Sequence, residues 1–67
     1  MADIQKLENI INARLDEIEH DKKFPVVSQL LKTKSGRKRV FERVKKMILF
    51  DGYDDIEACI NSIENVD

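Results

Sequence analysis

Hydrophobic residues recur along the first part of this chain at the three- and four-residue spacing that is typical of an amphipathic helix. The stripe comprises Ile4, Leu7, Ile11, Leu15 and Ile18, with Ile10 and Ala13 beside it. On the polar face, Arg14 is spaced to pair with Glu17, and Asp16 with His20. The pattern predicts a long first helix over about residues 3–20.

The next segment reads as a turn followed by a short helix. Pro25 disfavours the helical conformation at Phe24, and proline itself suits the first position of a helix. We therefore expect a turn over residues 21–24 and a helix over about 25–33. Its apolar positions are Val26, Val27, Leu30 and Leu31.

A third helix is expected over about residues 36–50, with Ser35 as its N-terminal cap. Its apolar stripe contains Val40, Phe41, Val44, Met47 and Ile48. Leu49 and Phe50 fall on the two flanks of this stripe. They either meet the fourth helix or stay exposed.

The fourth helix is expected over about residues 54–66. Asp54 and Glu57 have the spacing of a capping box, Tyr53 is placed to pack toward Ala58, and Gly52 suits the left-handed stop before it. The buried side comprises Ile56, Cys59, Ile60 and Ile63. The pattern as a whole predicts an all-α fold, a compact small bundle of four helices, as a single domain over residues 1–67.

Composition excludes several classes of protein. The chain has 67 residues, with one cysteine and one histidine, so it has no internal disulfide and too few ligands for a Cys/His zinc site. It has no apolar run long enough for a membrane span, no visible leader and no glycine-rich phosphate loop. We expect a cytoplasmic, non-enzymatic protein with no cofactor and no metal. So small a core is marginal, which favours a partner or a dimer.

The formal net charge of −1 hides a strong segregation. Residues 1–21 carry two bases and six acids, residues 22–46 carry ten bases and one acid, and residues 47–67 carry six acids and no base. A basic middle between acidic ends is an argument about partners, and it says little about fold.

Three features could suggest chemistry, and each has a simpler explanation. His20 could act with Asp16 or Asp21, but a solvated residue at a helix end is the favoured interpretation. Cys59 falls on an apolar stripe, where a thiol is buried and inert. The acidic cluster of Asp51, Asp54, Asp55 and Glu57 lacks the spacing of a calcium loop. Capping and compensation of the helix dipole account for Asp54, Asp55 and Glu57 without a metal.

The basic segment is the one feature that calls for a ligand. Arg37, Lys38 and Arg39 are expected in the first turn of the third helix, where cations oppose the helix dipole unless an anion binds there. Lys32 and Lys34 before them, and Arg43 and Lys46 after them, extend the basic track. Over about 25 residues, the succession of short helix, tight turn and longer basic helix is loosely similar to a helix-turn-helix unit.

Two functions follow from this pattern. The first is a binding module, a small regulator, inhibitor or adaptor of bacterial or phage type, which docks on a larger protein through the basic face of its third helix. The second is nucleic-acid binding through residues 32–46, alone or as a dimer. The contact residues for either ligand are Lys34, Arg37, Lys38, Arg39, Arg43 and Lys46. Two readings need no such ligand: neutralisation of the basic segment by the acidic helices of the same chain, and self-association as a structural protein.

Overall fold

The computed structural model describes the backbone of residues 2–66 and the side chains of residues 4–65. This part of the chain contains four α-helices and no strand. The helices are α1 (Ala2–Ile18), α2 (Pro25–Leu31), α3 (Lys34–Phe50) and α4 (Ile56–Val66). The predicted all-α bundle is therefore confirmed. None of the described helices combines the length and the apolar character that a bilayer-crossing helix requires.

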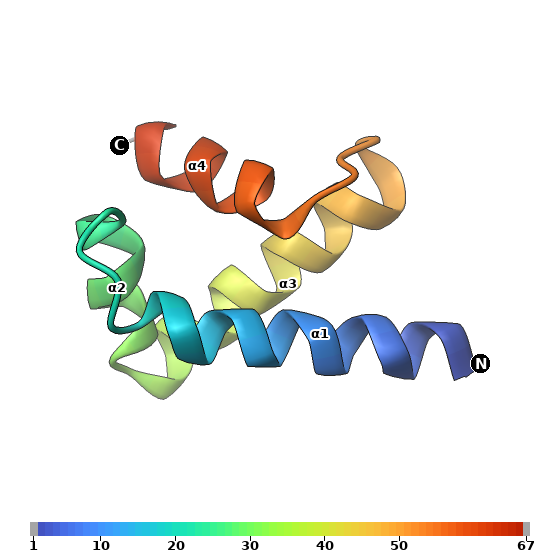
Figure 1. The fold of residues 1–67 in the computed structure, drawn as a ribbon, viewed down its shortest axis with the longest axis horizontal. Coiled ribbons are helices and arrows are strands. Elements are labelled where there is room, and N and C mark those ends of the chain that lie inside the picture. The colour runs from blue at the N-terminus through green and yellow to red at the C-terminus, as the bar shows by residue number, and fades with distance from the viewer. Residues whose placement is uncertain (1, 67) are drawn as a thin grey trace.

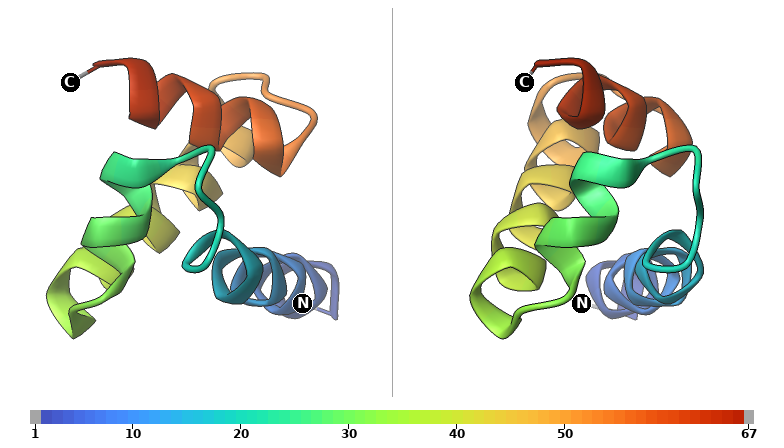
Figure 2. Two further views of the ribbon diagram at one scale, coloured as in Figure 1. Left: turned by 60° about the vertical axis from the view of Figure 1, so that its left-hand side comes forward. Right: turned by 90° about the vertical axis from the view of Figure 1, so that its left-hand side faces the viewer.

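The third helix is the centre of the arrangement. It packs against each of the other three helices, and α2 also contacts α1 and α4 (Figures 1 and 2). Ion pairs between the two ends of α1 and α3 show that these helices run antiparallel. The other three helices therefore cover part of the surface of α3, and the rest of that surface stays exposed.

All four helices and one turn contribute to a single core. Its thirteen members are Ile11, Leu15, Ile18, Phe24, Val27, Leu31, Val40, Val44, Met47, Ile56, Cys59, Ile60 and Ile63. The predicted stripes therefore face inward, and the ring of Phe24 is a core member that the expected turn had not indicated. Phe24 is non-helical, with φ of −126° and ψ of 68°, which agrees with the restriction that Pro25 places on the residue before it.

Two groups of apolar residues stay at the surface. Ile4 is 47% exposed although it lies on the predicted stripe, because the first turns of α1 project past α3 (Figure 1). Ile10, beside the stripe, is 50% exposed. Leu49 and Phe50 are 45% and 78% exposed. Of the two alternatives for these residues, contact with the fourth helix or exposure, exposure is therefore correct.

The turn between α2 and α3 is tighter than the sequence indicates. The predicted cap at Ser35 is wrong: the helix begins at Lys34, and the Thr33 hydroxyl accepts a hydrogen bond from the Gly36 amide at 3.0 Å. Gly36 is buried, and a Cβ on it would lie 2.1 Å from the backbone oxygen of Leu30. Glycine is required here because the backbones of α2 and α3 approach so closely.

The start of α2 depends on a residue from the far end of the chain. Phe24 has no side-chain acceptor, so the amides of Val26 and Val27 lack a local cap. Both donate to the Glu64 carboxylate of α4, at 3.0 Å and 2.9 Å. A carboxylate at a helix start also compensates the helix dipole. This cap, supplied across 37 and 38 residues of sequence, joins α2 to α4.

The start of α4 is capped one residue later than expected. Asp55, rather than Asp54, accepts from the Glu57 amide at 2.7 Å, so the predicted capping box is wrong. Tyr53 packs against the core, and its hydroxyl donates to Ser62 at 3.4 Å, while Ala58 is exposed. Gly52 has the predicted left-handed conformation, with φ of 79°.

Gly36→Ala tests the close approach of α2 and α3. Alanine normally stabilises a helix interior by about 1 kcal/mol relative to glycine. Here we expect a loss of about 2–3 kcal/mol, because the new methyl group collides with the Leu30 carbonyl. Urea unfolding measures the difference, and Ser35→Ala, at the exposed neighbouring position, is the control. A stabilised Gly36→Ala variant would contradict the packing of this turn.

Glu64→Ala tests the long-range cap. It removes both acceptors of the Val26 and Val27 amides, and we expect a loss of about 1–2 kcal/mol in the free energy of unfolding. Glu64→Gln keeps one oxygen acceptor and should lose less. Glu42→Gln is the matched control on an exposed residue, and equal stabilities for both glutamine variants would argue that the charge at position 64 is irrelevant.

Candidate functional site

The basic segment does not form one face of α3. Each residue of a helix is rotated by about 100° from the last, so adjacent bases point toward different neighbours. Lys34 and Lys38 line a shallow hollow beside α1, with Asn12 and Phe41 in its wall. Arg39 and Arg43 lie on the other side of α3, toward α2 and α4.

Arg37 is bound to α1 rather than exposed to a ligand. Its guanidinium lies 2.8 Å from an Asp16 carboxylate oxygen and 3.8 Å from one of Glu19. It also donates to the backbone oxygen of Asn12 at 3.2 Å. The sequence had placed Asp16 opposite His20, whereas the structure pairs it with Arg37. Arg37 therefore holds α1 against α3.

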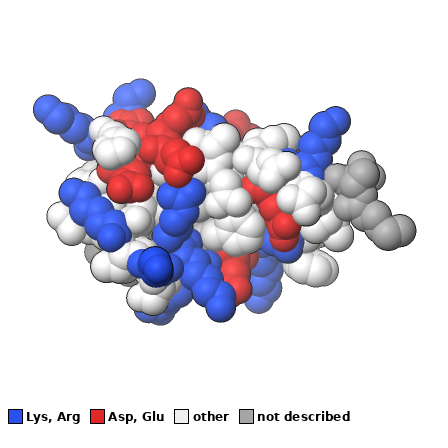
Figure 3. Space-filling view, turned by 90° about the horizontal axis from the view of Figure 1, so that it is seen from below, with Lys and Arg blue, Asp and Glu red and all other residues white. Residues whose placement is uncertain are grey.

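A second base of α3 is neutralised in the same way. The Lys45 ammonium lies 2.6 Å from the Glu8 carboxylate, and both side chains are about 30% exposed. The predicted Arg14–Glu17 pair also forms, within α1 at 2.7 Å. On the α1 side of the molecule, acidic and basic side chains lie next to one another (Figure 3). Part of the basic segment is thus neutralised by the acidic first helix of the same chain.

The structure also differs from the anion site that we expected at the start of α3. Because the helix begins at Lys34, Arg37 is its fourth residue, and Arg37, Lys38 and Arg39 lie beyond the first turn where the sequence had placed them. The influence of the helix dipole fades over that turn, so their cost in stability is small. The Gly36 amide already donates to Thr33. The helix start therefore does not gather the three cations around free amides.

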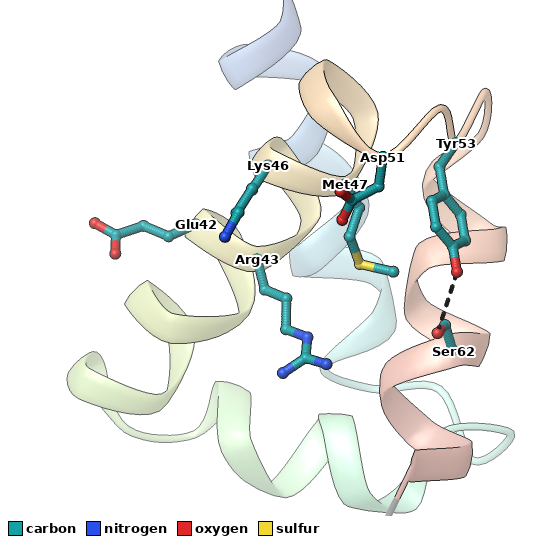
Figure 4. A pocket seen from close by; sticks show the side chains of 7 residues that line it. All are labelled: Glu42, Arg43, Lys46, Met47, Asp51, Tyr53 and Ser62. Atoms are coloured by element: carbon teal, nitrogen blue, oxygen red, sulfur yellow. Dashed lines mark hydrogen bonds between the residues drawn. The ribbon is translucent and has the colours of Figure 1, made fainter.

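Three of the remaining bases border two hollows, which share Arg43 and which we together call the basic groove. Its rim is formed by Arg39, Arg43 and Lys46, all exposed, and its apolar wall by Leu30, Val40, Met47, Tyr53 and Ile63. Arg43 borders both halves, and its side chain extends between α3 and α4 (Figure 4). Among residues 4–65, the three rim bases form no ion pair.

Two carboxylates limit the groove at one end. Asp51 and Glu42 line the same half as Lys46, although the Glu42 side chain points away from the hollow (Figure 4). Tyr53 and Ser62 close this half through their hydrogen bond. The positive character of the groove is therefore strongest near Arg39 and Arg43.

The other candidate groups, apart from Asp51, are not among the residues that line this groove. His20 is exposed in the turn after α1, and Cys59 is fully buried in the core. Asp51, Asp54 and Asp55 are exposed around the turn into α4, where Asp55 acts as the cap. Within the described side chains, no three His, Cys, Asp or Glu residues are arranged to hold a metal ion.

We expect the buried thiol of Cys59 to make the stability of the protein depend on pH. Burial raises the pKa of this thiol, and the charge of Asp55 raises it further. In the unfolded chain the thiol ionises at about pH 8.5. The contribution of the buried, protonated thiol to the free energy of unfolding is therefore complete below that pH and decreases as the pH rises above it. We expect the free energy of unfolding to fall more between about pH 8 and pH 10 in the wild type than in Cys59→Ala, by urea titration. Equal decreases would show that the thiol does not contribute.

Comparison with known proteins supplies no relative from which a role could be transferred. No family model matches the chain, and neither a curated protein nor a solved structure is similar to it. The feature that points to a function is the basic groove, where three bases without an ion pair among the described residues lie beside apolar side chains from α2, α3 and α4.

Proposed function

We propose that this chain is a non-enzymatic helical binding module that docks on a larger protein through the basic groove, as a small regulator, inhibitor or adaptor. The observation that carries the proposal is that three exposed bases of α3 lie beside apolar side chains from α2, α3 and α4. Arg37 and Lys45 meet acidic partners on α1, whereas Arg39, Arg43 and Lys46 meet none among the described residues. Unpaired charge steers the encounter with a partner of opposite charge.

The apolar part of the groove supports a protein ligand. Leu30 and Tyr53 are half-buried and border the rim bases. Protein interfaces combine such an apolar centre with a polar rim, and tyrosine and arginine are common among their strongest contacts. A nucleic-acid backbone would instead meet the Asp51 carboxylate at one end of the groove. We also place the protein in the cytoplasm, since its single free thiol suits a reducing compartment.

Nucleic-acid binding is the second candidate, and the exposed bases on both sides of α3 favour it. Only Lys32 and Thr33 separate the two helices, a connection one or two residues shorter than the turn of a helix-turn-helix unit. Lys34 and Lys38 are exposed on α3 in addition to the three rim bases. Such a ligand would use both sides of the helix, and its affinity would fall steeply with salt.

Affinity capture with matched charge reversals separates these functions. The tagged chain, Arg39→Glu/Arg43→Glu and Lys34→Glu/Lys38→Glu are incubated with nuclease-treated lysate of the organism that encodes the chain. We expect a defined protein to be retained by the wild type and the Lys34/Lys38 variant and lost with the Arg39/Arg43 variant. Circular dichroism confirms that the variants remain folded.

Two results would contradict protein docking. Retention of the same proteins by both variants would exclude the groove as the docking surface. Retention of nucleic acid alone, before nuclease treatment and at low salt, would favour the second candidate, particularly if both charge reversals abolish it.

A further inference from the structure

We infer that the occupant of the basic groove is an acidic amphipathic helix of the partner protein, laid against α3 on the flank opposite to α1. This inference rests on the proposed function, and it specifies the chemistry and the shape of the ligand. It is argued from the way in which α3 already binds one acidic helix of its own chain.

The side of α3 that carries Arg37 and Lys45, which we call its first flank, is covered by α1. Ile11 and Leu15 of α1 are buried in the core, while Glu8 and Asp16 of the same helix pair with Lys45 and Arg37 of α3. The two acids are eight residues apart, as are the two bases, a distance of about 12 Å along either helix. An apolar stripe with acids at a two-turn spacing is thus the form of helix that covers α3 here.

The second flank of α3 offers a similar set of groups with no partner among the described residues. Arg39, Arg43 and Lys46 follow one another at four and three residues, so they lie along one side of the helix over about 10 Å. Leu30 of α2 and Ile63 of α4 line the groove beside Arg39 and Arg43. This flank therefore presents two turns of positive charge next to apolar side chains.

The surface of α2 extends the apolar side of the groove. Leu30 also borders a second, mostly apolar hollow on α2, together with Pro25 and Val26. An amphipathic helix inserts its apolar face into such a depression through residues spaced by three and four. Its acids would then face Arg39 and Arg43, because the carboxylate of Asp51 disfavours acidic groups at the far end.

A designed peptide tests this occupant directly. The probe is a fluorescent, end-capped helical peptide of about 18 residues, with leucines on one face and glutamates four residues apart beside them, the spacing of Arg39 and Arg43. Its affinity is measured by fluorescence anisotropy for the wild type, Arg39→Glu/Arg43→Glu and Lys34→Glu/Lys38→Glu. Both variants change the net charge equally and lie on the same helix. A second peptide carries glutamine in place of each leucine.

We expect the Arg39/Arg43 variant to weaken binding by about tenfold or more and the Lys34/Lys38 variant by less than about threefold. The leucine-free peptide should bind weakly to every form of the protein, because charge alone does not fill the apolar side of the groove. Chemical-shift changes in the wild type should map to the amides around Arg43, Leu30 and Ile63.

Other outcomes overturn the inference. Equal weakening by both variants, or equal binding of the leucine-free peptide, would show a non-specific charge effect. No binding of the leucine-containing peptide would exclude an acidic helix as the occupant. The proposed function would still stand if the Arg39/Arg43 variant lost the captured partner, and it would fail separately if that partner were retained. Tight binding of a short DNA duplex, abolished by both variants, would replace the helix with a nucleic acid.

Discussion

The carboxylate of Glu64 at the start of α2 is the contact on which the arrangement of the helices depends. A seven-residue helix is too short to be stable alone, and α2 begins with a proline and two amides that have no local acceptor. Glu64 of α4 satisfies both amides, so the last helix of the chain holds the second one in place. Because only two residues separate α2 from α3, this contact acts together with the buried Val27 and Leu31 of α2 to hold the segment that leads into α3.

The position of α3 then divides the basic segment. Gly36 permits the close approach of α2 and α3, and the rotation of the helix from that point directs Arg37 to α1 and Arg39 to the opposite side. Arg37 and Lys45 stabilise the bundle through ion pairs, and Arg39, Arg43 and Lys46 border the basic groove. Lys34 and Lys38 are exposed beside α1 and form no ion pair among the described residues. A charge run that is continuous in sequence is therefore divided between different sides of α3.

The sequence allowed two alternative interpretations of the basic segment, neutralisation by acids of the same chain and binding of a ligand. The division of its bases is compatible with both. The acids of α1 do neutralise part of the basic segment, as the pairs of Arg37 and Lys45 show. The rim bases Arg39, Arg43 and Lys46 are outside that neutralisation among the described residues, and they support a role in binding. The same helix can serve both purposes because its two flanks face different surroundings.

The sequence by itself determined the four helices and most of their buried faces, because helical periodicity and the effects of Pro25 and Gly52 are local. The caps at Thr33 and Asp55 are local as well, three and two residues from the amides that they bind, although we expected them at Ser35 and Asp54. Tertiary structure decided that Glu64 of α4 caps the start of α2. It also decided which bases are neutralised. These contacts join residues up to 38 positions apart. Their partners follow from how the helices pack, and neither spacing nor composition along the chain specifies that packing.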